Sequence, residues 1–201
     1  VLSLGKWIFI RTTALVGSFF LAGAVATRFG EAAIGAHQIA FQLFFFLALV
    51  LDSVAIAGQI IVARELGAGR TGRAYEAGAR MIWLSVVAGC AFAFMLLALA
   101  GVLPRIFTGD AAVLHEATLL WPLFALMQPL NGAVFALDGV LIGASDGPFL
   151  ALSMVGAFLA CATVLLVALE AGWGIRGVWA ALVVLILVRL AAMLSRFRRG
   201  R

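Results

Sequence analysis

Charged residues are scarce in this sequence. Only 11% of its 201 residues are charged, whereas 65% are hydrophobic; a soluble domain has about 25% charged and about 45–50% apolar residues. The mean hydropathy is +1.18. A water-soluble fold of this length cannot bury so much apolar surface, so we exclude a soluble enzyme and a disordered chain. We expect the excess to face lipid.

Cysteine is scarce as well. The chain has two, Cys90 and Cys161, and both lie inside apolar runs. They are predicted to be small buried hydrophobic residues rather than a disulfide or a metal pair. A cleavable signal peptide pattern is also missing. The chain begins with Val1 instead of Met, so we expect it to be part of a longer protein.

Long apolar runs dominate what is present. A helix needs about 20 apolar residues to cross a membrane, and barrel strands would be shorter and strictly alternating. The sequence therefore predicts an all-α polytopic membrane protein with six transmembrane helices, in one domain over residues 1–201. The predicted helices cover about 7–27, 31–64, 76–103, 112–143, 147–169 and 174–195.

Two of these runs are too long for a single straight crossing. The run 31–64 would extend for about 50 Å as a helix, so we expect a long tilted helix whose ends leave the membrane. The run 112–143 contains Pro122 and Pro129. Proline removes a backbone donor and clashes with the preceding turn, so a kink or a break is expected there.

Basic residues predict the orientation. With a cytoplasmic N-terminus, eleven of the 14 Lys and Arg residues fall inside, and the other three, Arg28, Arg105 and Arg176, fall outside. This asymmetry follows the positive-inside rule and predicts that both termini are cytoplasmic. The basic tail 196–201 is expected to anchor this topology, with binding to anionic lipid as the alternative.

Polar residues inside the spans are the candidate functional groups, because ionisable groups at membrane depth are costly. Asp52 lies in the second span and Asp138 in the fourth. On a helical wheel, Asp52 shares an arc of about 100° with three glutamines. Asp138 shares an arc of about 80° with Gln128 and Asn131. The three glutamines are Gln38, Gln42 and Gln59.

These two polar stripes are expected to face each other in the interior, where they would bind substrate or an ion. Pro129 would free backbone carbonyls beside them, as in the broken helices of transporters. The alternative is that the amides simply join helices by hydrogen bonds. His37 could sense pH or make a structural hydrogen bond. We expect Gly139-Val-Leu-Ile-Gly143 to support close helix packing.

Two glycine-containing patterns imitate enzyme motifs. Gly67-Ala-Gly-Arg-Thr-Gly72 follows a long helix instead of a strand, so we interpret it as a turn and not as a dinucleotide site. Gly143-Ala-Ser-Asp-Gly147 likewise lacks the strand that a nucleophile elbow requires. We therefore predict that the protein is not an enzyme.

Several segments together resemble the multidrug and toxic compound extrusion (MATE) family, and within it the DinF-like branch. Ala36-His-Gln38 lies within the stretch 28–43, and Asp52-Ser-Val-Ala-Ile-Ala-Gly-Gln59 continues the similarity. Segments 9–12, 67–69 and 137–144 extend it over nearly the whole chain.

The resemblance implies one lobe of a two-lobe transporter, namely helices seven to twelve, with the N-terminal lobe absent. It also implies proton- or sodium-coupled antiport that exports drugs or organic metabolites across the bacterial inner membrane. No cofactor is implied beyond the coupling ion. The expected partners are a small-molecule substrate, membrane lipid, and the missing lobe or a second copy; no nucleic acid is expected. In DinF-like members the proton site is a carboxylate on the first helix, which lies outside this chain. Other branches of the family carry a carboxylate in helix seven, and this chain has none there.

Two alternatives remain open. A flippase for lipid-linked precursors would share the two-lobe layout, but it should have a strongly basic cavity, and the spans are expected to bury few Arg or Lys residues. A non-transporting structural subunit would tolerate loss of both Asp52 and Asp138.

Overall fold

The structure, a computed structural model, describes the backbone of residues 2–199 and the side chains of residues 5–199. Val1, Gly200 and Arg201 lie outside the described residues, so the last part of the predicted basic tail does too. The described chain folds into helices joined by short connections. They are α1 (Leu2–Arg28), α2 (Glu31–Gly67), α3 (Thr71–Ala98), α4 (Leu103–Phe107), α5 (Ala111–Leu126), α6 (Gln128–Gly143), α7 (Gly147–Glu170) and α8 (Gly174–Arg199).

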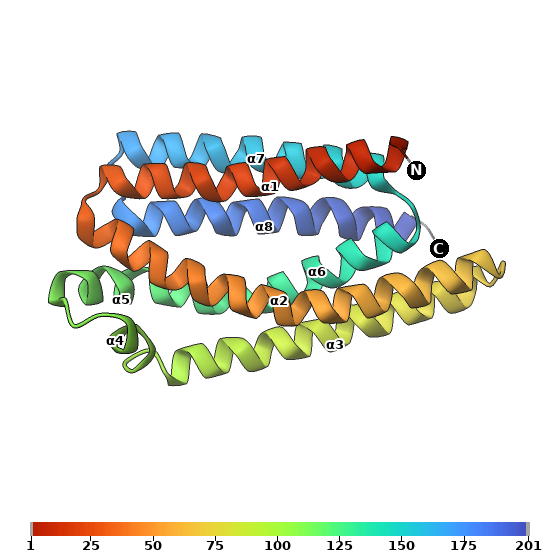
Figure 1. Cartoon of the computed structure of the whole chain (residues 1–201), viewed down its shortest axis with the longest axis horizontal. Coiled ribbons are helices and arrows are strands. Elements are labelled where there is room, and N and C mark those ends of the chain that lie inside the picture. Colours follow the sequence, from red (N-terminus) through yellow and green to blue (C-terminus); the bar gives the residue numbers. More distant parts are fainter. Residues whose placement is uncertain (1, 200–201) are drawn as a thin grey trace.

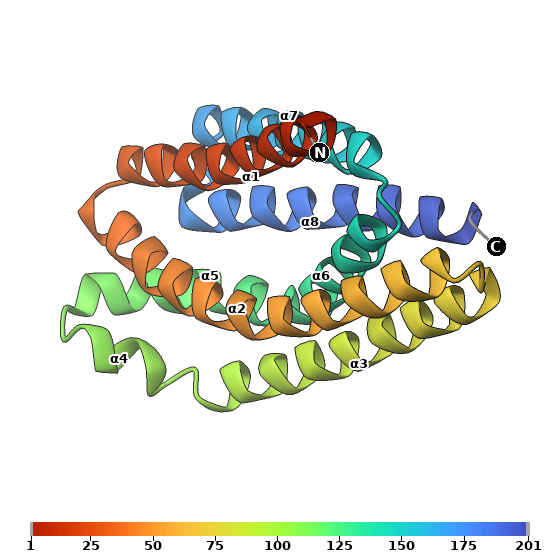
Figure 2. The ribbon, with the colours of Figure 1, turned by 45° about the vertical axis from the view of Figure 1, so that its right-hand side comes forward.

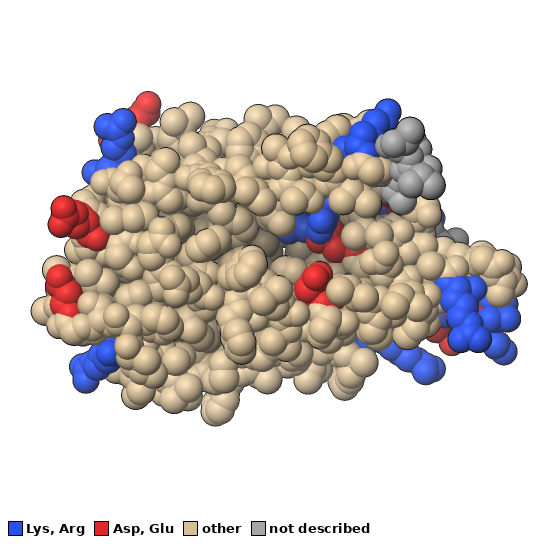
Figure 3. Space-filling view, in the orientation of Figure 1, with Lys and Arg blue, Asp and Glu red and all other residues tan. Residues whose placement is uncertain are grey.

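Among the described residues, five helices are long and apolar enough to cross a membrane, and the bent pair α5–α6 adds a sixth span. Most charged side chains lie toward the two ends of the molecule, and only a few are seen in the band between them (Figure 3). Large apolar side chains of the spanning helices, such as Phe20, Phe94 and Leu152, are exposed. The molecule is thus a multi-pass membrane protein whose apolar surface faces lipid.

The helices form two groups. In both views of the ribbon, α1, α7 and α8 lie together on one side, and α2, α3, α5 and α6 lie on the other (Figures 1 and 2). Helix α8 packs against α1 and α7 and also against α5 and α6, so it joins the groups. Trp179 and Leu182 of α8 and Phe124 of α5 are fully buried in the shared core.

The fourth span is broken, as the two prolines predict. Helices α5 and α6 meet at Met127 with a bend of 47°. Pro122 lies inside α5, and Pro129 lies in the first turn of α6, where its missing N–H costs nothing. The Gln128 side chain donates to the carbonyl of Phe124 at 2.9 Å, so it satisfies an acceptor next to the break.

Glycines let α6 approach its neighbours closely. A Cβ on Gly139 would lie 2.8 Å from the carbonyl carbon of Ala55 in α2. A Cβ on Gly143 would lie 2.6 Å from the backbone carbonyl oxygen of Gln59. On its other side, a Cβ on Gly132 would lie 2.7 Å from the carbonyl carbon of Ser85 in α3. The predicted close packing of the 139–143 motif is confirmed.

Two sequence expectations need correction. The third span was expected at 76–103, but α3 covers Thr71–Ala98 and a separate short helix follows. The charged first turn lies beyond the apolar band, so hydropathy did not include it. Cys161 is buried as expected, whereas Cys90 is exposed. Its apolar surroundings in the sequence reflect a lipid-facing position.

Candidate functional site

Asp138 stands at the centre of a buried ion cluster formed by three helices. Its Oδ2 accepts a hydrogen bond from Nη2 of Arg11 on α1 at 2.6 Å, and the same oxygen accepts from Nη2 of Arg189 on α8. Asp138 is 4% exposed and Arg189 is 3% exposed. We call Arg11, Asp138 and Arg189 the ion cluster; it ties the α1–α7–α8 group to the other group through α6.

The ion cluster is not electrically balanced. Two guanidinium groups share one carboxylate, which leaves one formal positive charge. The second carboxylate oxygen, Oδ1, is buried without a hydrogen-bond partner among the described residues. Because a buried charge is tolerated only when it is paired, each arginine depends on Asp138.

The polar stripe of α2 lies in a different environment. Gln38, Gln42 and Asp52 are exposed, and Gln59 is half-buried. Asp52 lies 21 residues after Glu31 and 15 before Gly67, which places it about 22 Å from the nearer helix end. Exposed Phe45, Leu49 and Ile56 share this face by helical spacing. We call these seven residues the α2 face.

The expectation that the two stripes meet in the interior is wrong. Gln128, Asn131 and Asp138 are buried, whereas most of the α2 stripe is exposed. No hydrogen bond joins the two stripes within residues 5–199. The buried arc of α2 is the opposite one, formed by residues such as Phe44, Leu51 and Ala55. Still, Asp52 lies one turn before Ala55, which packs on Gly139 next to Asp138.

Gln128 and Asn131 have local partners. The Asn131 amide donates to Oε1 of Gln128 at 3.4 Å, and the Gln128 amide donates to the carbonyl of Phe124. Gly89 of α3 packs directly on this segment, since a Cβ there would lie 2.7 Å from the Cα of Pro129. These amides therefore stabilise the bend between α5 and α6.

His37 is buried among aromatic rings. Its ring stacks on Phe41 with 6.1 Å between centroids and lies 5.9 Å from the ring of Trp179. Nδ1 has no hydrogen-bond partner in the described part of the chain. The structural hydrogen bond considered for His37 is thus not made by this atom, and ring packing holds the side chain.

Sequence reasoning missed Arg11 and Arg189, which were assigned to the cytoplasmic charge. Both lie inside predicted apolar spans, and this was the signal that could have found them. The expectation that the spans bury few Arg or Lys residues is confirmed for the described residues, among which Arg189 is the only buried basic residue and Arg11 is half-buried. One carboxylate partly offsets them, so the cluster is less basic than two free arginines.

Six candidate membrane crossings, a broken fourth span and charged residues within the spans define the fold as that of a multi-pass helical membrane protein. Residues 8–168 match the MatE family. The chain belongs to this family of multidrug and toxic compound extrusion proteins.

Known proteins support this assignment. The chain is 33% identical over 197 residues to Protein DETOXIFICATION 43 of Arabidopsis thaliana, a match that covers 98% of this chain and 37% of the relative. The chain therefore spans little more than a third of that relative's length. A crystal structure of a MATE protein in the bent conformation superposes with a TM-score of 0.86 and 17% identity, over 96% of this chain and 43% of the other. An outward-facing multidrug resistance MATE transporter gives a TM-score of 0.85 and 16% identity, over 96% and 42%.

Proposed function

We propose that this chain is one half of a proton- or sodium-coupled antiporter that exports drugs or organic metabolites across the bacterial inner membrane. Both termini lie in the cytoplasm in this proposal. The second half is a similar lobe, supplied by the same protein or by a second copy. One structural relative is a multidrug resistance transporter, which supports the substrate class.

The exposure of the α2 face at membrane depth carries the proposal. The side chains of Gln38, Gln42 and Asp52 are exposed on the surface of their own lobe. Contact with lipid is unfavourable for a carboxylate and for amides. They therefore need a water-filled or protein-lined cleft. The aromatic and aliphatic side chains among them suit a bulky organic substrate, since ligand sites combine apolar walls with a few polar groups.

In this proposal the two acids have separate roles. Asp52 contacts the substrate or the coupling ion in the cleft. Asp138 holds Arg11 and Arg189 and so keeps the two groups of helices in one arrangement. Binding of substrate or ion at the α2 face favours one arrangement of the lobes over the other, since a ligand shifts an equilibrium by its difference in affinity for the two states.

The test is transport by the intact protein in proteoliposomes. A proton or sodium gradient is imposed, and export of a fluorescent organic cation is measured for Asp52→Asn. We expect a fall of about tenfold or more, as for the loss of about 1.4 kcal/mol of interaction. The control is Glu170→Gln, which removes an exposed carboxylate from the end of α7. Unchanged transport in Asp52→Asn would contradict the proposal and favour a structural subunit.

A further inference from the structure

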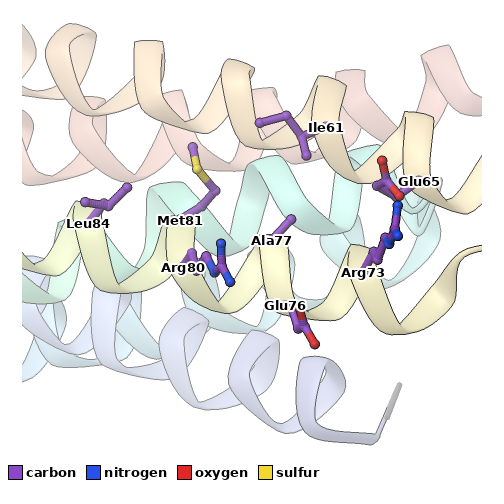
Figure 4. A pocket seen from close by; sticks show the side chains of 8 residues that line it. All are labelled: Ile61, Glu65, Arg73, Glu76, Ala77, Arg80, Met81 and Leu84. Atoms are coloured by element: carbon purple, nitrogen blue, oxygen red, sulfur yellow. The ribbon is translucent and has the colours of Figure 1, made fainter.

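A groove runs between α2 and α3 close to the turn that joins them. Its cavity volume is about 470 Å³. Ile61 and Glu65 of α2 form one wall, and residues of α3 that include Arg73, Ala77 and Arg80 form the other (Figure 4). The α2–α3 turn lies at the same end of the molecule as both termini (Figure 1).

The groove changes from charged to apolar along its length. Arg73 and Glu65 lie nearest the turn, whereas Leu84, Met81 and Ile61 line the part toward the apolar band. Arg73 and Leu84 are eleven residues apart on one helix, which corresponds to about 16 Å. Charged side chains line the groove from the turn as far as Arg80, and Met81, Leu84 and Ile61 line the rest. This order matches a phospholipid headgroup followed by the first part of an acyl chain at a membrane interface.

The two arginines of the groove are available for a ligand. Arg73 and Arg80 are exposed, and neither makes a hydrogen bond or ion pair within the described residues. Both carboxylate oxygens of Glu65 are taken by Arg70, at 2.7 and 3.1 Å, and these hydrogen bonds raise the pKa of Arg70. Glu76 points away from the α2 wall (Figure 4).

The charge balance therefore favours an anion. With Glu65 neutralised by Arg70, the groove retains two positive charges against one negative charge, that of Glu76. Arg73 and Arg80 are seven residues apart, so they lie on one face of α3 two turns from each other. Guanidinium groups bind phosphate oxygens through paired N–H donors.

We propose that this groove is a binding site for an anionic phospholipid of the adjoining leaflet. Arg73 and Arg80 hold the headgroup phosphate, and an acyl chain lies along Ile61, Met81 and Leu84. A soluble phosphate would use the arginines but would leave the apolar wall without a partner, so the lipid explains both parts of the groove. This inference does not depend on the transport activity proposed above.

The experiment measures how strongly spin-labelled phosphatidylglycerol associates with the intact protein, relative to spin-labelled phosphatidylcholine, in phosphatidylcholine vesicles. Arg73→Gln and Arg80→Gln are each expected to lower this ratio by about tenfold, the effect of losing one hydrogen bond to a charged group. Arg64→Gln is the matched control, because Arg64 is exposed at the same end but does not line the groove. It is expected to leave the ratio unchanged.

A second variant tests the groove itself without altering its charge. Ala77 lines the space between the walls, so Ala77→Trp is expected to fill it and to lower the phosphatidylglycerol ratio. An equal fall in Arg64→Gln would indicate diffuse surface charge and would overturn the proposal. An unchanged ratio in Ala77→Trp would do the same. Loss of the preference on adding inorganic phosphate at constant ionic strength would identify a site for free phosphate instead of lipid.

Discussion

Helices α2 and α6 pack against each other but place their polar residues in opposite surroundings. Helix α6 is enclosed by α2, α3 and α8, and it buries Gln128, Asn131 and Asp138. Helix α2 turns small and apolar residues toward α6 and leaves Gln38, Gln42 and Asp52 exposed. Polar groups of similar sequence pattern thus serve different ends: those of α6 hold the lobe together, and those of α2 are free to meet something outside it.

Removal of the Asp138 carboxylate should lower the stability of the protein more than any other change considered, because it disrupts the buried polar groups around α6. Asp138→Asn leaves Arg11 and Arg189 without their shared counter-charge, and breaking a buried pair typically costs about 3–5 kcal/mol. We expect a large fall in the thermal stability of the purified protein. Asp138→Asn combined with Arg189→Gln should recover part of it, and a single variant as stable as the wild type would contradict the role of the cluster.

An added methyl group between α2 and α6 should have the next largest effect. A Cβ at Gly139 meets the backbone of Ala55, and overpacking costs about 1–3 kcal/mol. Gly139→Ala should therefore lower the melting temperature. A methyl group added at Gly156 of α7 would meet no other atom within 4 Å, so Gly156→Ala is the matched control and should be neutral or slightly stabilising.

A smaller loss of stability is expected from a change in α5, the first helix of the broken span. The indole Nε1 of Trp121 donates to the carbonyl of Leu96 at 2.8 Å and so joins α5 to the end of α3. Trp121→Phe keeps an aromatic ring but removes this bond, at a cost of about 1 kcal/mol. Thermal unfolding followed by intrinsic fluorescence or by aggregation onset measures it. A change as large as that of Asp138→Asn would show that this hydrogen bond matters as much as the ion cluster and would contradict the expected order.

Substitutions on the α2 face should have the smallest effect on stability. Gln42→Ala and Asp52→Asn alter exposed side chains that lack hydrogen bonds within the described residues, and such changes stay within about 0.5 kcal/mol. The melting temperature should hardly move, although transport by Asp52→Asn should fall. A strong loss of stability in either variant would mean that the α2 face is part of the lobe's own core.

The sequence alone was sufficient for much of the fold. The lengths of the apolar runs predicted all six spans, because each span must cross the same thickness of hydrocarbon. Pro122 and Pro129 predicted the break in the fourth span, because proline disrupts a helix by local geometry. Helix boundaries were less well predicted: α3 begins at Thr71 and ends at Ala98 instead of covering 76–103.

The site was harder to predict. Helical spacing correctly grouped Gln38, Gln42 and Asp52 on one face, but periodicity cannot tell whether a polar face points into its own lobe or out of it. The partners of Asp138 lie 127 residues away at Arg11 and 51 residues away at Arg189. Their meeting depends on which helices become neighbours, and this follows from packing across the whole lobe.

The central claim is that the α2 face lines an aqueous cleft in the intact protein. The direct measurement labels single cysteines with a charged, water-soluble thiol reagent in membranes, in a Cys90→Ala and Cys161→Ala background. Gln42→Cys lies 11 residues after Glu31, and Leu159→Cys, its control on exposed α7, lies 11 residues before Glu170. Depth in the membrane is thereby matched. We predict rapid labelling of Gln42→Cys and little labelling of Leu159→Cys; equally slow labelling of both would contradict the account.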